Sequence, residues 1–355
     1  MKRLVLLATI LATALAGPPF ATGAQASGSS FTKYTDQPLP YWVYQPSGYT
    51  GTAAVPLVVY LHGCQQTAPD VAIGTRWNSE AEAKGFITVY PQQLSGLSGP
   101  ITTGNANACW NFYDPAEVGS RTSGEPAQIA AITREVMSKW NVDPKRVYVI
   151  GASGGAAEAD VMSILFPELY AAVGVVAGCP YGACTDATGA ISYGTWQRLG
   201  LTPRQIPAFI ADSVTDTVTV YPLNAAAVQQ YLGLDDFADD GLPNATVSRQ
   251  PATTQTYGLN QTPQPGTGDP CLPKSFTSPP NRFPCPGGII GFQGTYPYTV
   301  NTYNSSNGSE LLEFWTIYGA THGYPGGDPA GSFTDPLGPN ITDGAWNFFA
   351  RHPMP

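Results

Sequence analysis

The chain has 355 residues, of which only 12% are charged, and its formal net charge at pH 7 is −9. The sequence contains no basic cluster, and phosphate binding needs a cationic surface, so we expect neither nucleic acid nor an anionic membrane as a partner. Past the first residues no stretch approaches the roughly 20 apolar residues of a membrane span, so we expect no membrane-spanning segment.

Residues 1–26 have the pattern of a signal peptide. Two basic residues precede an apolar run that ends at Ala16, and this run is too short to span a membrane. The small residues before Ala26 suit signal peptidase, with Ala16 as an earlier alternative. We therefore expect a secreted, extracellular protein whose mature part, residues 27–355, is a single domain.

From residue 41 the chain alternates short apolar runs with helical patterns. We expect strands at 41–44, 56–61, 86–90, 146–150, 171–177, 206–211 and 311–317. We expect helices at 77–84, from 126 to about 140, at 156–166, 223–232 and 341–351. Strands that alternate with helices predict an α/β fold with a mostly parallel sheet covered by helices on both faces.

The alternation breaks between about residues 244 and 308, before the last expected strand. This stretch is rich in Pro, Gly, Thr and Asn and shows no evident periodicity. Segments of this kind are either functional or disordered. Two cysteines within it favour order, so we interpret it as a long Pro/Gly-rich insertion whose part at 257–296 has an unassigned role.

Six cysteines in an exported chain predict three disulfide bonds. Spacing favours two local pairs, Cys179–Cys184 and Cys271–Cys285, which leaves Cys64 with Cys109. A metal site is the alternative, but the sequence contains no Cys-x-x-Cys and its three histidines are scattered. We therefore expect disulfides and no metal.

A Gly-x-Ser-x-Gly pentapeptide, centred on Ser153, lies between a β-branched run and a helical segment. In a strand–turn–helix context this pattern indicates a nucleophilic serine on a tight, strained turn. The flanking glycines are needed because a Cβ there would clash with neighbouring backbone. The next backbone N–H, that of Gly154, would then face an oxyanion.

A serine nucleophile needs a base, and histidine has a suitable pKa near neutral pH. His352 lies at the C-terminus, and His62 precedes the serine in a loop after an early strand. His322 follows the last expected strand, and histidine comes last in the chain order Ser, Asp, His of α/β-hydrolases. We therefore predict that His322 is the base.

The third catalytic residue should follow the strand at 206–211, where the loop offers Asp212 and Asp216. Pattern alone does not choose between these two carboxylates, and either can be a simple turn former. A second oxyanion donor should come from the His62-Gly63-Cys64 loop, with the amide of Cys64 as the expected group. A Cys64–Cys109 bond would make that loop rigid.

Several further motifs resemble those of extracellular polyhydroxybutyrate depolymerases, a family that borders on feruloyl and acetylxylan esterases. The resemblance covers most of residues 41–355. Besides the serine turn, it rests on Leu61-His-Gly-Cys-Gln-Gln-Thr, Gly74-Thr-Arg-Trp-Asn, Cys109-Trp-Asn-Phe-Tyr-Asp-Pro, Gly124-Glu-Pro, Val142-Asp-Pro-Lys-Arg-Val-Tyr, Asp216-Thr-Val and the Tyr-Pro-Gly-Gly after His322. It implies an α/β-hydrolase fold and a Ser153, Asp216, His322 triad.

The chain departs from the family pattern at three places. Gly154 follows the serine where the family usually has alanine. The loop between Asp216 and Pro222 has one extra residue, and the segment at 257–296 is longer than expected. We expect Cys109 to hold Trp110 and Tyr113 near the loop of Cys64, and Tyr324 lies beside His322 in sequence. These three aromatic residues are candidate substrate contacts, although core packing is the more common role of such residues.

These observations predict a secreted serine esterase that works through an acyl-enzyme and needs no cofactor. The expected substrate is a poly(3-hydroxybutyrate)-type polyester or its oligomers. The alternatives are a feruloyl or acetylxylan esterase acting on plant polysaccharide and, from another class, a non-catalytic secreted binding protein on a hydrolase scaffold. We expect a monomer.

Overall fold

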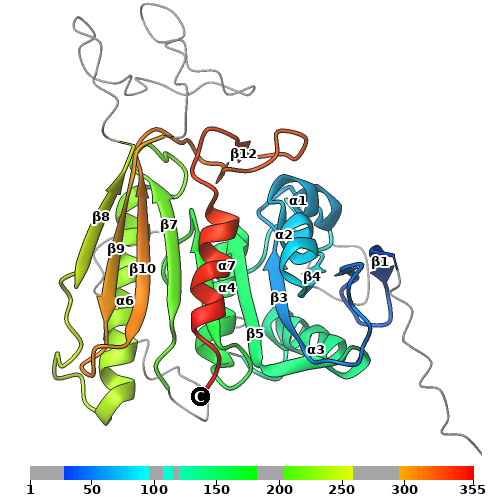
Figure 1. Ribbon diagram of the computed structural model, residues 1–355, viewed down its shortest axis with the longest axis horizontal. Helices are drawn as coiled ribbons and strands as arrows, with labels where there is room; N and C mark the ends of the chain where they lie inside the picture. Colours follow the sequence, from blue (N-terminus) through cyan, green and yellow to red (C-terminus); the bar gives the residue numbers. More distant parts are fainter. Residues whose placement is uncertain (1–27, 96–106, 115–119, 182–203, 259–295) are drawn as a thin grey trace, which may run out of the picture.

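The computed structural model describes residues 28–95, 107–114, 120–181, 204–258 and 296–355 (Figure 1). In this part of the chain the strands are β1 (Ser30–Tyr34), β2 (Tyr41–Gln45), β3 (Val55–Leu61), β4 (Ile87–Pro91), β5 (Val142–Ala152), β6 (Ala172–Val176), β7 (Ala208–Ser213), β8 (Thr253–Tyr257), β9 (Tyr298–Asn304), β10 (Glu310–Ile317), β11 (Tyr324–Pro325) and β12 (Thr334–Asp335). The helices are α1 (Ala68–Gly74), α2 (Trp77–Lys84), α3 (Gly124–Lys139), α4 (Gly154–Leu165), α6 (Tyr221–Asp240) and α7 (Ile341–Arg351).

Ten strands form one sheet in the order β1-β2-β4-β3-β5-β6-β7-β10-β9-β8 within the described residues. The strands from β4 to β10 in this order pair in parallel. Antiparallel strands extend the sheet at both ends. The predicted mostly parallel sheet is confirmed, and its central strands are buried on both faces because helices cover each face.

Two apolar clusters lie on the two faces of the sheet, because alternate residues of a strand point to opposite sides. Val59 of β3 belongs to the cluster that includes residues of α3, α4 and α6, whereas Val58 belongs to the cluster that includes residues of α1, α2 and α7. Figure 1 shows α7 crossing one face of the sheet, with α3 and α4 behind it. This two-sided burial fixes the strands whose ends carry the polar loops described below.

The stretch at 244–308 differs from the expectation of an irregular insertion. Its two ends form the antiparallel strands β8 and β9, which continue the sheet beyond β10. Threonine and tyrosine dominate both segments, and β-branched and aromatic residues favour strands. Residues 259–295, with most of the 257–296 segment, lie outside the described residues.

The helices also differ from the sequence prediction. The helix expected at 223–232 runs from Tyr221 to Asp240, and the short helix α1 was not predicted. Helix α1 begins at a Thr67 cap whose side chain accepts a hydrogen bond from the Asp70 amide. Across the described ranges, no helix combines the length and apolar character that a membrane crossing requires.

Candidate active site

The serine turn joins the end of β5 to the start of α4. Ser153 has φ 55° and ψ −125°, a left-handed conformation that non-glycine residues rarely adopt, so the expected strain at this residue is confirmed. A Cβ on Gly155 would lie 2.1 Å from the Leu61 carbonyl oxygen, and one on Gly151 would lie 2.2 Å from the Gly155 oxygen. The two glycines therefore allow β3, β5 and α4 to approach closely enough to present the serine at the sheet edge.

The loop after β3 lies beside this turn and is held by its own backbone. The Gly63 amide donates to Gln66 Oε1 at 2.9 Å, the Gln65 amide donates to the Asn107 oxygen at 2.7 Å, and the Gln66 amide donates to the Gly63 oxygen at 3.3 Å. In the part of the chain that the structure describes, the Cys64 amide has no such partner. Among the amides from Gly63 to Gln66, it is therefore the one available to an incoming anion.

A second amide without a partner among the described residues belongs to Gly154, the first residue of α4. The first N–H groups of a helix have no intrahelical acceptor and carry its positive end. Gly154 follows Ser153 directly, and Cys64 lies against this turn, since a Cβ on Gly154 would lie 2.8 Å from Cys64 Sγ. An oxyanion hole requires N–H donors beside the nucleophile. The sequence-based choice of Cys64 and Gly154 remains a prediction.

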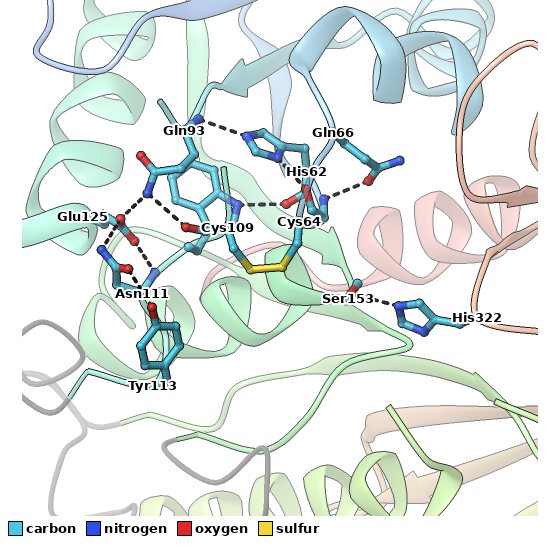
Figure 2. The surroundings of a disulfide bond; sticks show 12 residues. His62, Cys64, Gln66, Gln93, Cys109, Asn111, Tyr113, Glu125, Ser153 and His322 are labelled. Carbon is cyan, nitrogen blue, oxygen red and sulfur yellow. Dashed lines mark hydrogen bonds between the residues drawn. A yellow bond between two sulfur atoms is a disulfide. The ribbon is translucent and has the colours of Figure 1, made fainter. Parts of the chain in front are cut away.

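The Cys64–Cys109 disulfide is present, as expected from the cysteine spacing (Figure 2). It also explains the glycine after the serine. A Cβ on Gly154 would lie 2.8 Å from Cys64 Sγ, 2.9 Å from Cys109 Sγ and 3.2 Å from a ring carbon of Phe112. The disulfide occupies the space that a side chain at position 154 would need.

Of the other cysteines, Cys179 is disulfide-bonded, which agrees with the expectation that it forms a bridge. Its expected partner Cys184 lies outside the described residues, as do Cys271 and Cys285. Within the described ranges no group of three or more His, Cys, Asp or Glu side chains is arranged to hold a metal ion.

His62 supports the loop after β3 that carries Cys64 and is not placed to act as a base. Its ring is buried, its Nε2 accepts a hydrogen bond from the Gln93 amide at 3.0 Å, and burial lowers its pKa to about 4. The Trp110 indole donates to the His62 carbonyl oxygen at 2.8 Å and packs against the ring. The imidazole is therefore neutral at pH 7 and has a structural role.

A buried carboxylate anchors the segment that carries Cys109. Glu125 accepts hydrogen bonds from the Asn111 amide at 2.6 Å, from the Asn111 side chain at 2.8 Å and from the Gln93 side chain (Figure 2). Sequence reasoning did not assign Glu125 a role. The Gly124-Glu-Pro motif was the signal that pointed to it.

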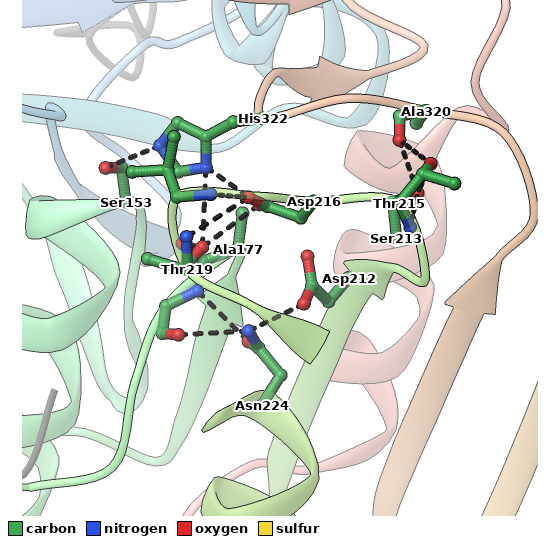
Figure 3. A network of polar contacts seen from close by, with 12 residues as sticks. Ser153, Ala177, Asp212, Ser213, Thr215, Asp216, Thr219, Asn224, Ala320 and His322 are labelled. Carbon is green, nitrogen blue, oxygen red and sulfur yellow. Dashed lines mark hydrogen bonds and ion pairs between the residues drawn. The ribbon is translucent and has the colours of Figure 1, made fainter. Parts of the chain in front are cut away.

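His322 lies within hydrogen-bond distance of both other members of the expected triad (Figure 3). Its Nε2 is 2.9 Å from Ser153 Oγ, and its Nδ1 is 2.7 Å from Asp216 Oδ2. With a proton on Nδ1, the imidazole donates to the carboxylate and Nε2 can accept the serine proton. These three side chains come from the loops after β5, β7 and β10. The carboxyl ends of these three parallel strands lie at the same edge of the sheet.

Of the two acidic candidates, Asp216 and not Asp212 contacts the histidine. Asp216 is buried, and its Oδ1 accepts from the Val218 amide at 2.7 Å and the Thr219 amide at 3.1 Å. The Thr219 hydroxyl lies 3.0 Å from Asp216 Oδ2 and 2.7 Å from the Ala177 oxygen. These hydrogen bonds fix the orientation of the Asp216 carboxyl group.

Two hydroxyl groups that sequence reasoning missed tie the acid loop to the histidine loop. Ser213 Oγ and Thr215 Oγ1 both donate to the carbonyl oxygen of Ala320, two residues before the histidine (Figure 3). Hydroxyl residues are common in loops, so their type alone carries no signal for this contact. The contact joins the loop that carries Asp216 to the loop that carries His322.

Two of the three expected substrate contacts are corrected by the structure. Trp110 is fully buried, and Tyr324 is 3% exposed with its hydroxyl 3.2 Å from the Trp77 indole nitrogen and 2.9 Å from the Thr342 hydroxyl. Neither ring is available to line an acyl-binding surface. Tyr113 is 59% exposed and remains a candidate contact.

Comparisons with known proteins find similarity to esterases. The family model described as "Esterase PHB depolymerase" matches residues 39–242. Poly(3-hydroxyalkanoate) depolymerase C of Paucimonas lemoignei is 30% identical over 81% of this chain and 59% of its own length. Feruloyl esterase B of Neurospora crassa is 30% identical over 64% of this chain and 74% of its own length.

Acetylxylan esterase A of Aspergillus ficuum is 32% identical over 52% of this chain. The chain thus spans less than two thirds of the length of the depolymerase, at 59%, and of this acetylxylan esterase, at 60%. The solved acetyl xylan esterase from Aspergillus awamori covers 91% of this chain with a TM-score of 0.58 and 19% identity. That likeness supports the α/β-hydrolase fold.

Proposed function

We propose, from the premise that this chain belongs to the esterase PHB depolymerase family, that it hydrolyses carboxylic esters through an acyl-enzyme on Ser153. The observation that carries the proposal is the chain of contacts from Ser153 Oγ through His322 to Asp216, at 2.9 and 2.7 Å. The strained φ of Ser153 adds support, because such strain occurs where function requires it.

In the first half-reaction Ser153 Oγ bonds to the ester carbonyl carbon while His322 Nε2 takes the serine proton. The carbonyl oxygen becomes an oxyanion, which the amides of Gly154 and Cys64 bind. The tetrahedral intermediate then breaks its bond to the leaving alcohol, and the alcohol oxygen receives the proton from His322. The products of this half-reaction are the free alcohol and the acyl-serine.

In the second half-reaction water attacks the acyl carbon and gives a proton to His322. A second oxyanion forms at the same two amides. Its collapse breaks the bond to Ser153 Oγ, which regains the proton, and the carboxylic acid leaves. Asp216 keeps the imidazole in the required tautomer and stabilises the imidazolium in both halves. No cofactor is needed for these steps.

The substrate class that we favour is a poly(3-hydroxybutyrate)-type polyester or its oligomers. The similarity to the depolymerase, which extends over 81% of this chain, supports this choice. The similarity to a feruloyl esterase and to acetylxylan esterases supports the second candidate, esterified plant polysaccharide. A non-catalytic scaffold is disfavoured, because the serine, histidine and carboxylate contacts are intact.

We also propose that residues 27–355 form one hydrolase domain, with an insertion at about 244–308, that is exported and acts as a monomer. Residues 1–26 have the composition of a signal peptide. The Cys64–Cys109 disulfide supports export, because disulfides persist in oxidising compartments. N-terminal sequencing of the secreted protein tests this, with Ser27 as the expected first residue and Gly17 as the alternative.

The activity is tested with purified protein on p-nitrophenyl butyrate, with Ser153→Ala as the decisive variant. We expect that variant to lose at least about 10³-fold in kcat and to remain folded. Ser138→Ala, the same change at an exposed position of α3, is the matched control. Residual activity of Ser153→Ala within about tenfold of the parent would contradict the assignment. Rates on 3-hydroxybutyrate oligomers, methyl ferulate and acetylated xylan then rank the substrate classes.

A further inference from the structure

A second carboxyl group lies next to the triad acid. Asp212 is in β7, four residues before Asp216, and is 2% exposed. It faces away from solvent at the point where the strand ends and the acid loop begins. Charged carboxylates are rarely buried without a cation or several hydrogen-bond donors, so this position calls for a physical explanation.

Asn224 of α6 holds one oxygen of Asp212. The Asn224 Nδ2 group donates to Asp212 Oδ2 at 2.8 Å and to the Gly178 carbonyl oxygen at 3.0 Å. Asn224 Oδ1 accepts from the Gly178 amide at 3.0 Å, which fixes the orientation of the amide side chain. Because Nδ2 can only donate, Oδ2 of Asp212 must be an acceptor.

The other oxygen, Asp212 Oδ1, is buried and has no hydrogen-bond partner among the described residues. Figure 3 shows it pointing away from Asn224 and toward the loop that carries Asp216. A carboxylate oxygen without a donor loses its solvation on burial, which strongly disfavours the charged form. A protonated oxygen in the same place is a donor and can use the neighbouring carboxylate as its acceptor.

The charges around the pair favour a single ionised group. In the described structure no lysine, arginine or histidine forms an ion pair with Asp212, whereas His322 pairs with Asp216. Among the described residues, the Tyr221 phenol of α6 is a further titratable group that interacts with Asp212, and it is hydrogen-bonded to Thr316. Burial, and then the negative charge of Asp216, raise the pKa of Asp212 well above its usual range.

We propose that Asp212 is a neutral carboxylic acid that donates its Oδ1 proton to Asp216 and thereby acts as a positioning residue for the triad. Asp216 then holds the one negative charge of the pair, supported by two backbone amides and facing the imidazole. Asn224 determines which oxygen of Asp212 bears the proton. This inference rests on the proposed function for its effect on catalysis, but the protonation of Asp212 does not depend on it.

Two variants distinguish the hydrogen bond that residue 212 donates from the ability of residue 212 to ionise. Asp212→Asn keeps an acceptor for Asn224 and a donor for Asp216 but cannot ionise, whereas Asp212→Ala removes the donor. We expect Asp212→Ala to lower kcat by roughly tenfold with little change in KM, and Asp212→Asn to rescue most of this loss. Without the hydrogen bond from residue 212, Asp216 attracts the imidazolium of His322 more strongly. The acid limb of the pH profile of kcat/KM should therefore move to higher pH by about half a unit in Asp212→Ala.

Melting temperature measured against pH tests the proton without any assay of activity. A raised carboxyl pKa in the folded state means that the parent loses stability as pH rises from the unfolded value, about 3.9, toward the folded one. The Asp212→Asn variant lacks this loss, so its melting temperature relative to the parent should rise between pH 4 and 7. Asp235→Asn is the matched control, a buried carboxyl with a raised pKa remote from the triad, which should show the same trend and leave the acid limb unchanged.

The proposal would be overturned if the difference in melting temperature between Asp212→Asn and the parent stayed constant from pH 4 to 7, because Asp212 would then be ionised. The proposal would also be overturned if the acid limb of the pH profile of kcat/KM moved down by about one pH unit in Asp212→Asn. Such a shift would show that the substitution removes a negative charge. A parent enzyme without esterase activity would contradict the proposed function alone, and the melting temperatures would still decide the protonation state.

Discussion

The two sides of Ser153 are held in different ways. On one side, His322 and Asp216 are kept in place by hydrogen bonds between loops, through Ser213, Thr215 and Thr219. On the other side, the loop that carries Cys64 is held by the Cys64–Cys109 disulfide and by close backbone contacts that need glycine. Hydrogen bonds therefore hold the histidine side, whereas a covalent bond and close backbone packing hold the other side.

This difference matches the chemistry proposed for each side. The imidazole must accept and release a proton twice in each turnover, so its neighbours must stabilise two charge states. The oxyanion donors do not change state, and their contribution depends on being oriented before the charge develops. We therefore expect changes on the histidine side to remove the chemical step and changes on the oxyanion side to weaken it by smaller factors.

The largest effect is expected from Asp216→Asn on the histidine side. An asparagine would hold the imidazole in the wrong tautomer, so we expect kcat to fall by about 10⁴-fold. Measurement of kcat on p-nitrophenyl butyrate checks this, with Asp212→Asn as the comparison that should lose far less. The reverse ranking would make Asp212 the triad acid.

Gly154→Ala tests the oxyanion side at the position where the family usually has alanine. The added Cβ would meet both sulfurs of the disulfide at 2.8 and 2.9 Å, so the Gly154 amide or the Cys64 loop must move. We expect kcat to fall by about 10- to 100-fold with KM nearly unchanged. Gly48→Ala is the matched control, since a Cβ there meets no atom within 4 Å. A Gly154→Ala enzyme with parental kcat would show that the loop is not rigid.

Removal of the disulfide by Cys109→Ala should have a smaller effect on activity. The Cys64 amide would keep its place less well, so we expect kcat to fall by several-fold up to about tenfold at temperatures well below unfolding. The check is kcat measured beside near-UV circular dichroism. Loss of activity only in step with unfolding would mean that the bond stabilises the fold and does not orient the donor.

The smallest effect concerns pH and His62. Because burial lowers its pKa to about 4, the unfolded chain binds the proton first, and the folded state loses stability as pH falls from about 6.5 to 4. His62→Gln retains an acceptor for the Gln93 amide and does not titrate. Its melting temperature relative to the parent should rise as pH falls through this range, and a constant difference would contradict a neutral, buried His62.

The sequence predicted those features that depend on local pattern or chain order. The serine turn is encoded within five residues, and His322 follows from its place after the last parallel strand. The residue pattern alone left Asp212 and Asp216 open, because the two lie four residues apart and only the geometry decides which side chain contacts the imidazole. The family resemblance implied Asp216, and the structure places Asp216 against His322. The same limit explains why Trp110 and Tyr324 were wrongly predicted to contact substrate. The sequence around an aromatic residue does not reveal whether the ring is buried or exposed.

The supporting contacts were not predictable because they join distant segments. Gln66 bonds to Ser332, 266 residues away, and Ser213 bonds to Ala320 across two loops. No periodicity or spacing marks such pairs. The glycine at position 154 was visible as a departure from the family pattern, but its cause, the adjacent disulfide, became clear only from the structure.

The central claim is that Ser153 is a nucleophile activated by His322, and covalent labelling tests it most directly. The protein is treated with a fluorophosphonate, digested and mapped by mass spectrometry, beside a His322→Ala variant. We predict one phosphonylated residue, Ser153, formed at a rate that parallels the loss of esterase activity, and labelling that is slower by at least about 10²-fold in the variant. An active enzyme that is labelled at another residue, or equal labelling rates in parent and variant, would contradict the account.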